Sequence, residues 1–187
     1  TTSGLDCISL STREVVHCEY LDEQGGRHPI KGYMSDILLY GNTVYALNTY
    51  GEVWQWRTDR SDADRGLFSP LELPVSSSII KMCPYGNSGQ MFVLTKETLA
   101  LVNLSDKEVL AQIPVDNIMN ADNSGHYTLY YSSRMDAVII GAGIGSSTYA
   151  YRLSDGGELD VLDVELPGDV KDVIDYDGAT YFATDGG

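Results

Sequence analysis

The sequence predicts an all-β fold built from a repeated unit of four short strands, and three observations support this. Short apolar runs alternate with Gly, Asn and Asp turn residues, and no stretch has the pattern of a long amphipathic helix. A Gly-Asn type of turn recurs at intervals of about 40–50 residues. A Ser-Asp type of turn and a proline recur in step with it. Together these signals favour a β-propeller, whose four-stranded antiparallel blades repeat around a ring.

The stretch 37–56 shows the repeated unit most clearly. It contains three apolar runs separated by turns at Gly41-Asn42 and Tyr50-Gly51. Gly and Asn tolerate positive φ, so the first turn suits a tight hairpin. The run 44–47 is short and partly β-branched or aromatic, which favours a buried strand over a helix.

The other turns divide the rest of the chain into blades, whose strands we call a to d. The a–b turns are expected at Gly41-Asn42, Gly86-Asn87-Ser88-Gly89, Asn123-Ser124-Gly125 and Asp177-Gly178. The c–d turns are expected within 7–21, 53–74, 99–115 and 148–167, and prolines 29, 74, 114 and 167 mark strand ends. These markers predict blades at about 30–74, 75–114 and 115–167. They leave a c–d half-blade at 7–21 and an a–b half-blade at 170–185.

Residues 1–187 are therefore expected to form a single propeller domain. Pairing of the two terminal half-blades would close a four-bladed ring, and the alternative is that the chain is part of a larger ring. In a hairpin over 7–21 that turns at Thr12-Arg13, Cys7 would stand directly opposite Cys18. Such a pair could form a disulfide, although two reduced, half-buried cysteines are the favoured interpretation.

Composition limits the classes of partner. The formal net charge is −15, from 27 acidic against 12 basic residues, and an acidic surface repels phosphate, so nucleic acid is not an expected partner. No apolar run is long enough to span a bilayer, and we expect a soluble chain. The sequence does not indicate the cellular compartment of the protein. The glycosylation sequon Asn103-Leu104-Ser105 can be used only if the protein is secreted.

Three stretches carry a family resemblance. VYALNTYGEVWQW (44–56) and LALVNLSDKEVLAQIPV (99–115) resemble the blades of quinoprotein-like propellers. MDAVIIGAGIGSSTYAYRLSDGGELDVLDVELP (135–167) looks like a kelch blade. The resemblance implies a propeller fold. It does not extend to a quinone cofactor, because no matching set of central residues is present.

The stretch 137–163 also resembles a dinucleotide-binding fingerprint. Gly141, Gly143 and Ser146 would approach a pyrophosphate at the start of a helix, and Asp163 would bind the ribose. Only 24 residues follow Asp163, and the preceding chain has no alternation of strands and helices. We therefore favour a propeller blade over this flavin or dinucleotide site.

Acidic residues and histidines offer only weak metal candidates. Asp59, Asp62 and Asp64 partly resemble a calcium loop, but a solvated loop with local ion pairs is the favoured interpretation. The acids Asp169, Asp172, Asp175 and Asp177 are interpreted as a solvated edge strand and turn. The three histidines lie on different predicted segments without metal-ligand spacing. No cofactor is predicted, with calcium and flavin kept as alternatives.

The leading functional hypothesis is a non-enzymatic scaffold that presents loops to a protein or a glycan. Candidate contact residues are Tyr33, Tyr50, Trp54 and Trp56, because aromatic side chains supply binding hot spots when they are exposed. One alternative is an enzyme or cofactor-binding protein with a site in the central channel or at 141–146. Another is a structural module of a larger virion or secreted complex.

Overall fold

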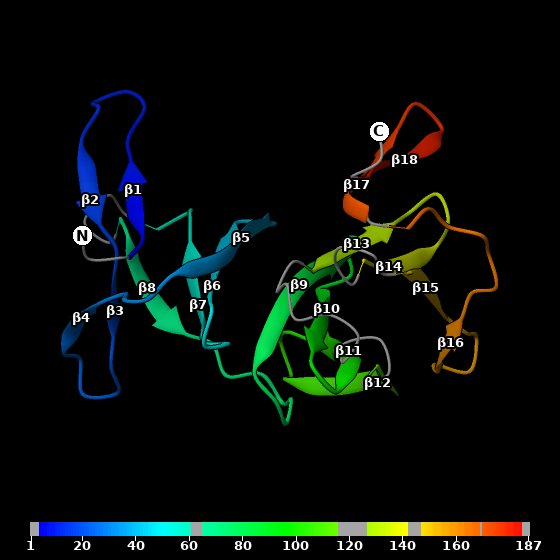
Figure 1. The fold of residues 1–187 in the computed structure, drawn as a ribbon. Coiled ribbons are helices and arrows are strands. Elements are labelled where there is room, and N and C mark those ends of the chain that lie inside the picture. The colour runs from blue at the N-terminus through cyan, green and yellow to red at the C-terminus, as the bar shows by residue number, and fades with distance from the viewer. Residues whose placement is uncertain (1–3, 61–64, 116–126, 142–146, 169, 185–187) are drawn as a thin grey trace. The chain divides into compact units, whose positions relative to one another are not determined.

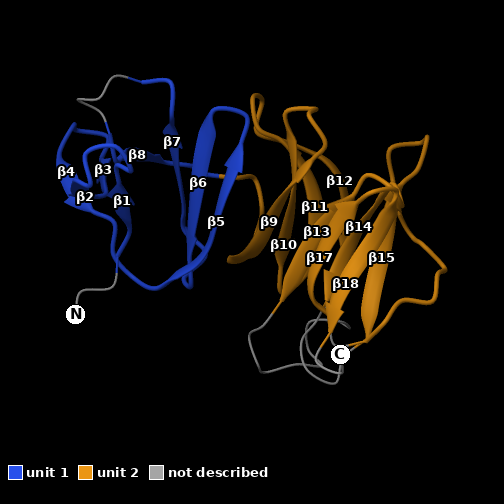
Figure 2. Cartoon of the chain, turned by 90° about the horizontal axis from the view of Figure 1, so that it is seen from above, with its two compact units in different colours: residues 1–72 blue, residues 73–187 orange. Residues whose placement is uncertain are grey.

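The computed structural model describes residues 4–60, 65–115, 127–141, 147–168 and 170–184, and every regular element among them is a β-strand (Figure 1). The chain divides into two compact units, 1–72 and 73–187, which we describe separately (Figure 2). The first unit contains β1 (Asp6–Ile8), β2 (Val15–His17), β3 (Glu19–Leu21), β4 (Arg27–Pro29), β5 (Met34–Tyr40), β6 (Thr43–Asn48), β7 (Val53–Arg57) and β8 (Leu67–Pro70).

The second unit begins with one complete blade and continues with another. Its strands are β9 (Ile79–Tyr85), β10 (Gln90–Thr95), β11 (Thr98–Asn103), β12 (Glu108–Pro114), β13 (Thr128–Ser132), β14 (Ala137–Gly141), β15 (Thr148–Leu153), β16 (Leu159–Val161), β17 (Val170–Tyr176) and β18 (Ala179–Thr184). Two four-stranded antiparallel sheets run in the orders β12-β11-β10-β9 and β13-β14-β15-β16, and β17-β18 is a separate two-stranded sheet. These sheets confirm the predicted all-β fold with four-stranded antiparallel blades.

Sheet packing in the second unit explains why its central strands are almost wholly apolar. Val138 and Ile140 of β14 join Phe92, Leu94 and Leu101 in one core cluster. The alternate residues of β14, Ala137 and Ile139, pack with Val170 and Val173 of β17 in another. Because successive side chains of a strand point to opposite faces, a strand buried on both faces must be apolar at every position.

The first unit differs from the expected simple blade. Strands β5 to β8 form the predicted antiparallel meander, but the sheet has six strands in the order β4-β3-β8-β7-β6-β5. Strand β3 pairs in parallel with β8, matching Glu19 to Leu67 and Tyr20 to Phe68. The expected hairpin over 7–21 therefore ends at His17, and residues 19–21 belong to another sheet.

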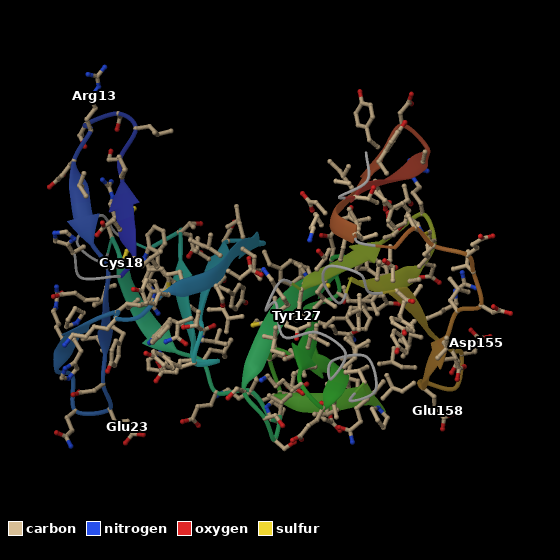
Figure 3. All side chains as sticks on the ribbon, in the orientation of Figure 1. Arg13, Cys18, Glu23, Tyr127, Asp155 and Glu158 are labelled. Carbon is tan, nitrogen blue, oxygen red and sulfur yellow. The ribbon has the colours of Figure 1, made fainter. Side chains whose placement is uncertain are left out.

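The predicted opposition of Cys7 and Cys18 is wrong, because Cys7 lies opposite Val16 in the β1–β2 hairpin. Arg13, at the tip of this hairpin, has a φ of 59°, and its N–H donates to the Ser9 carbonyl at 2.7 Å (Figure 3). Cys18 lies between β2 and β3, where its N–H donates to the Leu5 carbonyl at 2.9 Å. Burial, followed by the nearby Cys7 and Asp6, raises the pKa of the Cys18 thiol to about 12, and both thiols are free.

Three of the four predicted a–b turns join the expected strands, at Gly41-Asn42, at 86–89 and at Asp177-Gly178. The fourth does not. The turn between β13 and β14 is formed by Ser133 to Asp136, whereas Asn123-Ser124-Gly125 lies outside the described residues. With this correction the a–b turns recur at more even intervals than the sequence motifs alone indicated.

Candidate functional site

The β6–β7 turn and the segment before β5 together form what we call the aromatic turn surface, comprising Gly32, Tyr33, Asn48, Tyr50 and Glu52. The Thr49 N–H donates to the Tyr33 carbonyl at 2.9 Å, which ties the two segments together. The tyrosines at 33 and 50 are 72% and 70% exposed. The fold thus brings together the two tyrosines that the sequence analysis singled out separately.

A buried side chain holds this turn in shape. Asn48 is only 1% exposed, and its Oδ1 accepts the N–H groups of Tyr50 at 2.9 Å and Glu52 at 3.0 Å. Its Nδ2 donates to Glu52 Oε2 at 2.7 Å. Asn is favoured in turns because its amide makes such bonds to the backbone that follows it. Sequence reasoning missed this role, although the Asn-Thr-Tyr-Gly-Glu order between two strands is its signal.

Gly32 allows the Tyr50 ring to lie against the backbone beside Tyr33. It has a φ of 99°, and a Cβ at this position would lie 3.3 Å from Tyr50 Cε2. Both its backbone conformation and this close approach favour glycine. The rings of Tyr33 and Tyr50 are exposed to solvent, while the backbone that carries them is held by the hydrogen bonds of Thr49 and Asn48.

We expect Asn48→Ala to lower the free energy of unfolding by about 1–3 kcal/mol, because it leaves the N–H groups of Tyr50 and Glu52 without their acceptor. Chemical denaturation of the variant and the wild type measures the difference. Asn48→Asp keeps an acceptor oxygen for both N–H groups but sets a buried carboxylate against Glu52, so its loss near pH 7 should be at least as large. An alanine variant as stable as the wild type would contradict the role of Asn48.

The two tryptophans lie differently from the tyrosines. Trp54 is 5% exposed and belongs to the core of the first unit with Ala46, Phe68 and Cys18. Trp56 is half-buried, packs against the same core, and has its ring centroid 6.1 Å from that of Phe68. The pair therefore contributes mainly to packing, and Trp54 has almost no surface to offer a partner.

The candidate cofactor residues are followed by a strand rather than by the helix of a dinucleotide-binding fingerprint. A dinucleotide fingerprint needs a helix after Ser146, but residues 148–153 form strand β15. Gly143 and Ser146 lie outside the described residues, and Asp163 is exposed. Gly141 has a packing role, because a Cβ there would lie 2.7 Å from the Val170 carbonyl oxygen.

The proposed calcium loop is described only at its start. Asp59 accepts hydrogen bonds from Arg57, at 3.0 Å from Nε and 2.5 Å from Nη2, and this partner lowers the pKa of the Asp59 carboxyl group. Asp62 and Asp64 lie outside the described residues. In the described ranges, no group of three His, Cys, Asp or Glu side chains could hold a metal ion.

Asp175 is not the solvated carboxylate that the sequence analysis expected. Its Oδ1 accepts the hydroxyls of Ser132 and Thr180, both at 2.8 Å, and its Oδ2 accepts Ser133 Oγ and the Arg134 N–H, both at 3.2 Å. Burial alone would raise the pKa of Asp175, but these hydrogen bonds lower it below its ordinary value. The network attaches the β17–β18 hairpin to the β13–β14 turn.

No protein-family model matches the sequence, and no curated protein matches it significantly. Among solved structures, the computationally designed Ika8 protein is similar with a TM-score of 0.57 and 14% identity, covering 98% of this chain and 50% of that chain. YCF48 from Cyanidioschyzon merolae has a TM-score of 0.49 and 14% identity, covering 80% of this chain and 47% of that one. The C-terminal WD40 domain of Sif2 has a TM-score of 0.46 and 12% identity, covering 72% and 36%.

The successive four-stranded antiparallel sheets place the chain in the β-propeller fold class. The chain spans half or less of the length of these three structures. The finer resemblance to quinoprotein-like or kelch blades stays a prediction. In the described residues, no helix is long and apolar enough to cross a membrane.

Proposed function

We propose that the chain is a non-enzymatic binding module that presents the aromatic turn surface to a protein partner. One observation carries the proposal, namely that a fully buried Asn48 fixes a turn which exposes Tyr50 beside an equally exposed Tyr33. Exposed tyrosines on a fixed backbone bind at low entropic cost, since little conformational freedom remains to be lost.

The chemistry of this surface favours a partner segment with basic and apolar side chains. The two phenol rings offer apolar area and faces that attract cations. The exposed Glu52 adds a carboxylate beside them, and the net charge of −15 steers basic partners toward the chain. A glycan is the other class of partner that exposed tyrosines suit, and the experiment below separates the two.

We expect the double variant Tyr33→Ala/Tyr50→Ala to lose at least ten-fold in partner capture, because it removes both exposed rings. The immobilised chain would be used to capture partners from an extract of its source cells, and the captured material would be quantified. A protein partner is lost when the extract is first treated with trypsin. A glycan survives trypsin and is lost after periodate oxidation, which would overturn the assignment to a protein.

Two control variants make the test specific. Tyr33→Phe/Tyr50→Phe retains both rings and should retain most of the capture. Leu10→Ala removes a large apolar side chain that is 93% exposed in the β1–β2 turn, and it should leave capture unchanged. If the double alanine variant captures as well as the wild type while its melting curve is unaltered, the aromatic turn surface is not the binding site.

A further inference from the structure

The outermost strands of the two complete blades in the second unit border a groove. Among the described residues, β12 pairs only with β11 and β16 pairs only with β15 (Figure 1). The groove has a volume of about 660 Å³ and is lined by residues 109–112 of β12 and by residues 157–159, where β16 begins. This volume lies within the range of about 300–1,000 Å³ that is usual for ligand sites.

The floor of the groove is apolar. Ala111 and Leu159 are 8% and 5% exposed and belong to the core cluster that fills the space between the two blades. Leu110, which also lines the groove, is 40% exposed. The pairing of β11 with β12 shifts at this point, so that Leu110 is the extra residue of a β-bulge. The core between the blades can therefore be reached from solvent along β12.

The hydrogen-bond pattern of β12 directs the backbone of Gln112 away from its own blade. The Val115 N–H donates to the Glu97 carbonyl at 2.8 Å, which identifies this pair as a hydrogen-bonded pair of the β11–β12 ladder. Hydrogen-bonded pairs alternate with non-bonded pairs in an antiparallel ladder, so Ile113 and Ala111 also bond to β11. Gln112, which lies between them and lines the groove, presents its N–H and carbonyl to another strand.

Two features limit the length of any strand that can add to this edge. The bulge at Leu110 interrupts the edge on one side of Gln112. Pro114, which has no N–H, interrupts it on the other. Bulges and prolines at sheet edges hinder pairing with long strands. The edge of β12 therefore suits a short extended segment better than another sheet.

Acidic side chains surround the groove. Glu158 lines it, and Asp155 lies in the same β15–β16 turn (Figure 3). Both are exposed, as is Glu108 at the start of β12, and Lys107 offsets one of these charges. No basic side chain forms an ion pair with Glu158 among the described residues. Arg152 of β15 donates instead to carbonyls of the β13–β14 turn. The surroundings of the groove therefore favour a basic ligand.

We propose that a short extended peptide with alternating apolar and basic side chains binds in this groove by adding to the edge of β12. Its main chain would bond to the N–H and carbonyl of Gln112. Alternate side chains of an extended segment point to opposite sides, so the apolar set would cover Ala111 and Leu159 while the basic set lies near Glu158. The groove belongs to the second unit, so this proposal does not depend on the aromatic turn surface of the first.

The probe for this site is a fluorescein-labelled peptide in which Lys alternates with Leu, and fluorescence anisotropy measures its binding to the full chain. We expect saturable binding that Glu158→Arg weakens at least ten-fold, which corresponds to about 1.4 kcal/mol. Glu14→Arg is the matched control, because it makes the same change in net charge at an exposed position of the β1–β2 turn. It should leave the affinity unchanged.

Strand addition is tested separately with Gln112→Pro. Because the Gln112 N–H points away from β11, proline should leave the blade intact and remove a donor to the peptide. We expect at least a ten-fold loss of affinity, whereas Gln112→Ala retains the N–H and should bind like the wild type. If the proline variant melts at a lower temperature, a peptide N-methylated at alternate residues tests the same pairing on the wild-type chain.

Several results would overturn the proposal. Full affinity of Gln112→Pro or of the N-methylated peptide would show that no strand is added to β12. Equal binding of a peptide with Ser in place of Leu would show that the apolar floor is not used. An equal loss in Glu14→Arg and Glu158→Arg would indicate attraction by net charge alone. A probe that does not bind the wild-type chain would exclude this ligand class.

Discussion

Replacing Trp54 with alanine should lower the free energy of unfolding by about 3–5 kcal/mol, the usual cost of removing a large buried aromatic side chain. Trp54 is 5% exposed and contacts the core of the first unit, where its ring centroid lies 6.3 Å from that of Tyr20. The cavity left by the indole would lie among Ala46, Phe68 and Cys18. These neighbours come from β6, from β8 and from the connection between β2 and β3, so they cannot close the cavity by moving one loop.

Both tryptophans of the chain, Trp54 and Trp56, belong to the first unit. Urea denaturation followed by tryptophan fluorescence therefore reports on this unit, and Trp56 remains as the probe in the variant. Trp56→Ala is the matched control, and its half-buried ring should contribute less to stability. A Trp54→Ala variant that keeps its stability but loses partner capture would show instead that Trp54 contacts the partner.

Much of the fold could be predicted because propeller blades have local sequence signals. The turn residues at Gly41-Asn42 and Asp177-Gly178 lie between strands close together in the sequence, and the structure has hairpins at both places. One of the turn motifs misled. The Asn123-Ser124-Gly125 motif predicted a blade turn, but Ser133 to Asp136, which includes no glycine, makes the turn within the described residues.

Long-range pairing could not be read from the sequence. The parallel contact between β3 and β8 joins Tyr20 to Phe68, and nothing near either residue indicates it. The same limit applies to the candidate site. Exposed tyrosines at 33 and 50 were plausible individually, but their proximity depends on the Thr49–Tyr33 hydrogen bond and on the space beside Gly32. Asp175 was misjudged because three of its four hydrogen-bond donors lie more than 40 residues earlier in the chain.

Replacing Asp175 with alanine should lower the free energy of unfolding by about 2–4 kcal/mol. The carboxylate accepts four hydrogen bonds, and Ser132, one of its donors, is fully buried. Hydrogen bonds to a charged group each stabilise by about 1.5–3 kcal/mol, but the loss should be smaller than the sum of four, because the exposed donors regain water and Ser132 Oγ still lies 3.0 Å from Thr180 Oγ1. Far-UV circular dichroism during urea denaturation would measure the loss. Asp172→Ala is the control, because Asp172 is an exposed carboxylate on the same strand.

The same network makes stability depend on pH. Since its hydrogen bonds hold the pKa of Asp175 below the ordinary value of 3.8, the folded state binds the proton less tightly than the unfolded state. This contribution to stability is present above the unfolded pKa and disappears as the pH falls through the lower, folded value. Asp175→Asn removes the titrating group, so the stability difference between wild type and variant should be constant near pH 7 and shrink below about pH 4. A difference that stays constant down to pH 2 would contradict a depressed pKa of Asp175. It would show that the contribution of the network to stability does not depend on the charge of this carboxylate.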